Sequence, residues 1–173
     1  MSAIEELLLA NTRYSTGRAP RQLPMPPARH LAIVTCMDAR IIPEAAFGIA
    51  EGDAHVIRNA GGRAKDALRS LVISQRLLGT NEVAVIHHTD CGMLTFTNDS
   101  IRRKIQAEVG ADAGHLDFLP FADLERSVAE DVNLLRSSPL IPRRIPIRGF
   151  VYDVGSGTLT EVVIRESTAK VGR

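Results

Sequence analysis

Short apolar runs alternate with stretches of helical periodicity from residue 30 onward. The runs HLAIVT, AHVIRN and EVAVIHH are apolar at half or more of their positions, and AKDALRSLVISQRLLG, before the last of them, has apolar residues at helical spacing. Nearly continuous apolar strands separated by helices are typical of a parallel sheet covered on both faces. The pattern predicts an α/β domain whose mostly parallel central sheet is flanked by helices.

The second half of the chain adds two helices and two strands to this pattern. We expect helices at 99–109 and 121–136, a strand at 147–154 and a last strand near 158–164. Gly155 and Gly157 lie between the two strands as turn residues. Such a short connection predicts an antiparallel hairpin, which places the C-terminal strand at the edge of the sheet.

The N-terminal segment differs from the rest of the chain. Residues 3–15 have partly helical spacing of apolar side chains, and Gly17 offers a stop. Residues 19–29 contain four prolines, which cannot continue a helix or join a central strand. We therefore divide the chain into an N-terminal helix with a proline-rich arm (1–29) and one α/β domain (30–173), and expect the arm to embrace a second subunit.

Composition and charge narrow the function classes. The chain has 173 residues, of which 45% are hydrophobic, a size and composition typical of a single globular domain. Its net charge of +1 argues against nucleic acid or an anionic membrane as the partner. No basic secretory leader and no apolar run of membrane-spanning length is recognisable, so the sequence predicts a cytoplasmic protein.

The two cysteines are the first candidates for chemistry. Cys36 follows the strand LAIVT directly, and Cys91 follows EVAVI closely, within HHTDCG. Ligands of open α/β sheets bind beyond the carboxyl ends of the strands. Two neighbouring strands would therefore bring Cys36, His88 and Cys91 together.

This set of side chains suits zinc. Two thiolates and one imidazole match a tetrahedral zinc ion, and three protein ligands leave a fourth position for water, as in catalytic sites. The spacing His88-x-x-Cys91 lets one tight turn present both ligands, and Gly92 suits a helix start that would help to keep the thiolate charged. In the alternative interpretation both cysteines are inert core residues.

Two charged residues follow Cys36 closely. Asp38 and Arg40 would share one side of the chain if the segment is extended, and arginine can hold a carboxylate bidentately. Asp38 could then accept a hydrogen bond from water on the zinc, or coordinate the zinc itself and close the site. The alternative is an ordinary surface ion pair.

The other histidines and a basic stretch have simpler interpretations. His87 alternates to the opposite side of its strand from His88, which predicts a buried, hydrogen-bonded side chain. We expect structural or solvated roles, or at most one proton shuttle, for His30, His55 and His115. The stretch RRIPIR is expected to form a solvated face or a subunit contact, with an anion site as the lesser alternative.

Three segments together resemble a known family. CMDAR, VIRNAGG and HHTDCG closely resemble the β-class carbonic anhydrases, strongly over residues 30–95 and more weakly at RGFVYDV. The resemblance implies that Cys36, His88 and Cys91 bind zinc and that Asp38 and Arg40 form the catalytic dyad. It also implies a homodimer or a dimer of dimers, in which the N-terminal helix crosses onto a neighbour.

The sequence departs from the family pattern in two respects. Gly62 stands where many members have asparagine, and the chain is shorter than the plant-type members. The short form with HHTDCGMLTF resembles a compact bacterial branch that also includes carbonyl sulfide hydrolases.

The expected reaction is the reversible hydration of carbon dioxide to bicarbonate by zinc-bound hydroxide. Asp38 would orient the hydroxide, Arg40 would hold Asp38, and the backbone of Asn59, Ala60 and Gly61 would form a close wall beside the substrate. The simpler interpretation of this last segment is a strand-to-helix turn. Two thiolates offset the charge of the zinc, so we expect activity to rise toward alkaline pH.

Two alternatives share this site, and two others do not fit the sequence. The same site could hydrolyse carbonyl sulfide to hydrogen sulfide and carbon dioxide, or form a non-catalytic zinc module in which Asp38 closes the fourth position. A phosphatase-like cysteine loop would need a longer spacing than Cys36 to Arg40. No G-x-G-x-x-G follows the first strand, which argues against a dinucleotide site.

Overall fold

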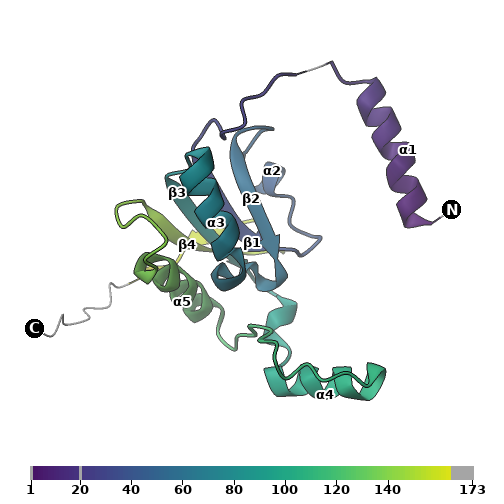
Figure 1. Ribbon diagram of the computed structural model, residues 1–173, viewed down its shortest axis with the longest axis vertical. Coiled ribbons are helices and arrows are strands. Elements are labelled where there is room, and N and C mark those ends of the chain that lie inside the picture. The colour runs from purple at the N-terminus through teal and green to yellow at the C-terminus, as the bar shows by residue number, and fades with distance from the viewer. Residues whose placement is uncertain (1, 20, 165–173) are drawn as a thin grey trace, which may run out of the picture.

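A five-stranded sheet forms the centre of the molecule in a computed structural model that describes residues 2–19 and 21–164 (Figure 1). The strand order is β2-β1-β3-β4-β5, with parallel pairing except between β4 and β5. The strands are β1 (Leu31–Cys36), β2 (Ala54–Asn59), β3 (Glu82–His88), β4 (Ile147–Tyr152) and β5 (Leu159–Glu161). The predicted parallel sheet with an antiparallel C-terminal edge strand is confirmed.

Alternation along the strands divides the core between the two faces of the sheet. Val34 on β1 and Val85 on β3 face α3 (Ala64–Leu78) and α5 (Leu124–Ser137), which cover one side. Ile33 and Ile86 belong to the opposite core cluster, together with Ile49, which follows the short helix α2 (Pro43–Ala46). Because both faces are covered, the strands tolerate the nearly continuous apolar sequences from which they were predicted.

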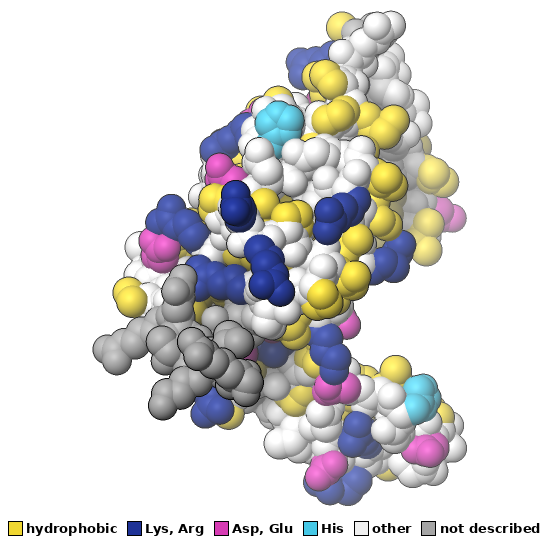
Figure 2. Space-filling view, turned by 60° about the vertical axis from the view of Figure 1, so that its left-hand side comes forward, with side chains coloured by type: hydrophobic (Ala, Val, Ile, Leu, Met, Phe, Trp, Pro, Cys, Tyr) yellow, Lys and Arg dark blue, Asp and Glu magenta, His cyan; other side chains and the backbone are white. Residues whose placement is uncertain are grey.

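The observed boundaries refine several predictions. Helix α5 begins at Leu124 because Asp123 caps it, accepting a hydrogen bond from the Arg126 backbone N–H. The penultimate strand ends at Tyr152, since the Asp153 carboxylate accepts hydrogen bonds from the following turn and draws the chain out of the ladder. Helix α4 (Asn98–Val109) follows a short 3₁₀ turn, η2 (Gly92–Leu94), and projects from the body (Figure 1), where it forms part of the lower lobe of the space-filling view in Figure 2.

Helix α1 (Ala3–Thr16) lies apart from the sheet and its helices (Figure 1). A capping box between Ser2 and Glu5 fixes its start. None of its described residues is buried, and Leu7 and Leu8 are each 68% exposed. The helix predicted at 3–15 is confirmed, and it leaves its apolar residues uncovered, while the division of the chain into 1–29 and 30–173 stays a prediction. Within the part of the chain that the structure describes, no helix combines the length and apolarity that crossing a membrane requires.

A glycine turn lies against the carboxyl ends of β1 and β3. The 3₁₀ turn η1 (Ala60–Gly62) joins β2 to α3, and Gly62 has a φ of +68°. A Cβ at Gly62 would lie 2.9 Å from the carbonyl carbon of Thr35 and 3.0 Å from the nitrogen of Cys36. These are backbone atoms of a central strand, so the contact can be relieved only by moving β1 or the turn.

We predict that Gly62→Ala lowers the free energy of unfolding by at least about 2 kcal/mol more than Gly110→Ala does. Gly110 has a φ of +70° and open space around its Cβ position, so Gly110→Ala tests the left-handed backbone without the clash. Urea unfolding followed by circular dichroism, with and without a chelator, measures both values. Equal losses would show that the backbone of β1 does not restrict the turn.

Candidate metal centre

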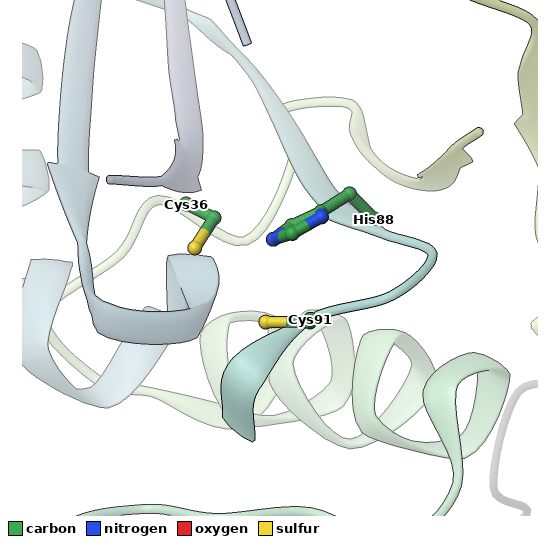
Figure 3. Close-up of side chains that lie close together, drawn as sticks. All are labelled: Cys36, His88 and Cys91. Atoms are coloured by element: carbon green, nitrogen blue, oxygen red, sulfur yellow. The ribbon is translucent and has the colours of Figure 1, made fainter. Parts of the chain in front are cut away.

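The sheet topology brings both cysteines and His88 to one edge. Cys36 is the last residue of β1, His88 is the last residue of β3, and Cys91 follows three residues later at the start of η2. Because β1 and β3 are neighbouring parallel strands, their carboxyl ends lie side by side. Figure 3 shows the three side chains converging from these segments.

The three side chains are arranged as a ligand set. The sulfur atoms of Cys36 and Cys91 and a ring nitrogen of His88 lie within 4.8 Å of one another, and all three residues are buried. His88 Nδ1 lies 2.8 Å from the Thr89 carbonyl oxygen and donates to it, so Nε2 presents its lone pair to the cysteines. Among the described residues this buried Nε2 has no hydrogen-bond partner. A buried polar atom without a partner is costly, and a metal ion would satisfy it.

The donor atoms fit zinc in particular. Two sulfurs and one imidazole nitrogen suit a borderline-soft tetrahedral ion, and three protein ligands leave one coordination position open. As free side chains, the two thiols shift each other's pKa. The Cys91 side chain lowers the pKa of Cys36 to about 4, and the Cys36 side chain raises the pKa of Cys91. The thiolate, which a low pKa favours at Cys36, is the form of cysteine that binds a metal ion.

The turn at η1 supplies a further donor to this group. The backbone N–H of Gly61 donates to Cys36 Sγ over 3.3 Å. The Asn59 side chain fixes the turn, since its Oδ1 accepts from the Arg63 N–H at 2.7 Å and its Nδ2 donates to the Arg63 carbonyl at 2.9 Å. A Cβ at Gly61 would lie 2.8 Å from Met93 Cγ, so glycine permits the close approach. The predicted strand-to-helix turn is confirmed, and contact of Asn59, Ala60 and Gly61 with substrate stays a prediction.

Asp38 and Arg40 form a bidentate pair beside the cluster. Arg40 Nε donates to Asp38 Oδ1 at 3.0 Å, and Nη2 donates to Oδ2 at 2.8 Å. The two side chains were expected to share one side if the segment were extended, and they pair although it is not. The chain turns at residues 39–40, and the Arg40 backbone N–H also donates to Asp38 Oδ1.

The electrostatics of this pair keep the carboxylate charged. Arg40, which donates to both oxygens, holds the pKa of the Asp38 carboxyl well below its usual range, and Asp38 in turn raises the pKa of Arg40. Asp38 Oδ2 lies 3.9 Å from His88 Nε2. An ionised acceptor therefore lies next to the place where the three ligands meet.

Sequence reasoning missed two residues that brace this region. Arg58 donates from Nε to the Cys36 carbonyl at 3.0 Å and from Nη2 to the Asp38 carbonyl at 2.6 Å. Asp90 accepts a hydrogen bond from Arg40 Nη1 at 2.5 Å. Both lie in the segments VIRNAGG and HHTDCG, but only the fold brings them to partners 20 to 50 positions away.

The remaining histidines lie outside the cluster. His87 is fully buried on the other side of β3, with Nδ1 2.7 Å from Ser127 Oγ and Nε2 3.2 Å from Asp131 Oδ2. His55 Nδ1 lies 2.7 Å from Ser74 Oγ. The expectation that His87 is a buried, hydrogen-bonded residue is confirmed.

Comparisons with known proteins agree with this geometry. A family model described as carbonic anhydrase matches residues 31–159. The chain is 46% identical to β-carbonic anhydrase 1 of Mycobacterium tuberculosis, over 94% of this chain and 99% of that protein. It is 34% identical to a carbon disulfide hydrolase of Acidithiobacillus thiooxidans, over 80% of each chain.

A solved structure extends the likeness to three dimensions. The crystal structure of a carbonic anhydrase from Streptococcus mutans superposes with a TM-score of 0.90 and 49% identity, covering 94% of this chain and 99% of that one. The family match, the identities and the cluster of Cys36, His88 and Cys91 all lead to one assignment. The chain belongs to the β-carbonic anhydrase family.

Proposed function

We propose that this protein catalyses the reversible hydration of carbon dioxide to bicarbonate, with zinc held by Cys36, His88 and Cys91. The observation that carries the proposal is the buried, unpartnered Nε2 of His88, which faces two thiols and lies 3.9 Å from the ionised Asp38. Bound zinc would act as a Lewis acid that lowers the pKa of a water molecule and so provides a nucleophile at moderate pH. The assignments of individual residues below belong to this proposal.

Asp38 and Arg40 orient the nucleophile. Asp38 accepts a hydrogen bond from the attacking water and thereby fixes the direction of its lone pair, while Arg40 holds the carboxylate from its far side. Because its pKa lies well below the usual range, Asp38 stays an acceptor throughout the neutral and alkaline range. The water oxygen adds to the carbon of carbon dioxide, and a proton leaves as bicarbonate forms.

Apolar side chains surround this reaction and suit an uncharged substrate. Ile41, Met93 and Phe121 are buried in one cluster with Cys36 and Cys91. They exclude bulk water from the sulfur side of the cluster, which strengthens the electrostatic interactions within it. We assign to the backbone of Asn59, Ala60 and Gly61 the role of a close wall beside the substrate.

Hydrolysis of carbonyl sulfide, or of carbon disulfide, is the second candidate function. The similarity to a carbon disulfide hydrolase favours it, because both reactions need the same attack of water on the central carbon of a small linear molecule.

A non-catalytic zinc module, in which Asp38 occupies the fourth position, is the third candidate function. The bidentate Asp38–Arg40 pair supports an open position rather than a closed one.

We predict fast hydration of carbon dioxide in stopped-flow assays, slow sulfide release from carbonyl sulfide or carbon disulfide, and a hydration rate that rises between pH 7 and pH 8.5. The rise follows from the two thiolates, which offset the charge of the zinc so that water ionises less readily. One zinc-quantified preparation serves all assays, with Cys91→Ala as the inactive control. Faster sulfide release than hydration would favour the second function, and bound zinc with neither activity would favour the third.

We predict about one zinc ion per purified chain, and loss of most of it in Cys36→Ser, His88→Ala or Cys91→Ser. His55→Ala is the matched control, because His55 is also a hydrogen-bonded histidine on a strand. It lies at the start of β2, whereas the assigned ligands lie at the carboxyl ends of β1 and β3 or just beyond. Inductively coupled plasma mass spectrometry measures the metal content. Full zinc in any of the three ligand variants would contradict the assigned ligand set.

For assembly we propose a homodimer or a dimer of dimers in which α1 packs on a neighbouring copy. The exposed apolar residues of α1 support this, because a helix that buries no apolar face in its own chain gains little stability from being isolated. The cytoplasmic location stays a prediction from the sequence.

We expect the double variant Leu7→Glu/Leu8→Glu to shift the protein toward monomers, because it replaces two exposed apolar side chains of α1 with charged ones. Val109→Glu is the control, since Val109 is an equally exposed apolar residue at the end of α4. Light scattering coupled to size-exclusion chromatography gives the mass of each species. An unchanged mass for the α1 variant would place the interface elsewhere.

A further inference from the structure

Arg40 is held by two acidic residues rather than one. Its Nε and Nη2 donate to Asp38, whereas Nη1 donates to Asp90 Oδ2 at 2.5 Å and Nη2 also donates to the Asp90 carbonyl at 2.9 Å. Asp90 lies in the loop between His88 and Cys91, so the guanidinium bridges Asp38 to the loop that carries two of the assigned ligands.

The backbone of Asp90 adopts a conformation that serves this contact. Its φ is +53°, in the left-handed region that most residues with a side chain avoid and that aspartate tolerates better than most. In this conformation the carboxylate and the carbonyl of one residue both reach Arg40. Unfavourable backbone geometry persists when surrounding contacts hold it, and here the contacts are with Arg40.

A network holds the guanidinium better than one exposed pair does. Arg40 is 47% exposed, Asp38 18% and Asp90 78%, so an isolated Arg40–Asp90 pair would contribute little, whereas several charges linked by bidentate contacts contribute more. Asp38 also has a competing position, because its Oδ2 is only 3.9 Å from His88 Nε2, close to where a bound zinc would attract a carboxylate. A guanidinium attached at its second edge is fixed in place and can hold Asp38 away from the metal.

We propose that Asp90 is a positioning residue which, through Arg40, keeps the Asp38 carboxylate turned away from the metal and so keeps the fourth coordination position open. The effect of Asp90 on catalysis rests on the proposed function. Its effect on the position of the Arg40 guanidinium does not. It links the loop of the two ligands to the orientation of the dyad.

The test uses Asp90→Gly and Asp90→Asn. Glycine removes the carboxylate without backbone strain, whereas asparagine keeps the side-chain shape and removes the charge. Asp99→Asn is the matched control, because Asp99 is 79% exposed against 78% for Asp90 and also lies near an arginine, Arg102. If either Asp90 variant fails to fold, the other still tests the proposal.

The first readout needs no activity. In metal-free protein, NMR measures solvent exchange of the Arg40 Nε–H. We expect exchange about tenfold faster in Asp90→Gly, a smaller rise in Asp90→Asn and no change in Asp99→Asn. A change of this size is typical when one of two charged groups in direct contact is removed. Exchange equal to that of the wild type in both Asp90 variants would overturn the proposal.

The second readout is a double-mutant cycle on the zinc-loaded enzyme. We expect Asp90→Gly to lower kcat for carbon dioxide hydration by about tenfold, with zinc content and KM nearly unchanged, and to have little further effect in an Asp38→Asn background. An equal loss in that background, or a loss that follows zinc content, would show that Asp90 acts on the loop alone and would overturn the proposal. A wild type without hydration activity would refute the proposed function and leave the exchange result valid.

Discussion

The parallel pairing of β1 with β3 is the constraint on which the site depends. The register sets Thr35 opposite Ile86, so Cys36 and His88 leave adjacent strands at nearly the same height. Neither residue could reach the other if a further strand lay between them, because neighbouring strands are already about 4.8 Å apart. The third ligand, Cys91, follows the end of β3 by three residues, so a short turn after His88 is enough to bring it to the other two. Apolar burial on both sheet faces, rather than any contact among the ligands, fixes this arrangement.

A buried polar network secures the turn that touches the ligand set. Asp131 on α5 accepts a hydrogen bond from the Ala64 N–H at 2.9 Å, lies 3.2 Å from His87 Nε2 and pairs with Arg63 at 3.3 Å. It therefore fixes the start of α3 directly after the glycine turn. The network lies between the sheet and α5, with His87 stacked on Phe121. Replacing one member would leave buried groups without partners, which is costlier than losing an exposed pair.

The sequence predicts the strands, the ligand set and the Asp38–Arg40 pair, because hydrophobic periodicity and strand-end position are local properties. It does not reveal Arg58 or Asp90 as braces, since the carbonyls and the guanidinium that they contact are far away in the chain. It also extends the strand at 147–154 two residues too far, because the turn after Tyr152 depends on the Asp153 side chain. Boundaries and braces depend on individual hydrogen bonds, which periodicity does not encode.

The charges around the site also bear on release of the product. Two thiolates offset the two positive charges of a bound zinc ion, so the ligand set as a whole would be neutral. Arg40 is a cation next to it, but most of its N–H groups donate to Asp38 and Asp90, which leaves the guanidinium poorly suited to hold an anion. A site that takes up an uncharged molecule and forms an anion benefits from this balance, because strong attraction for the anion would delay its departure. With the roles proposed for Asp38 and Asp90, the second carboxylate on Arg40 would serve both steps, since it would fix Asp38 for the attack and offset the positive charge that would otherwise retain bicarbonate.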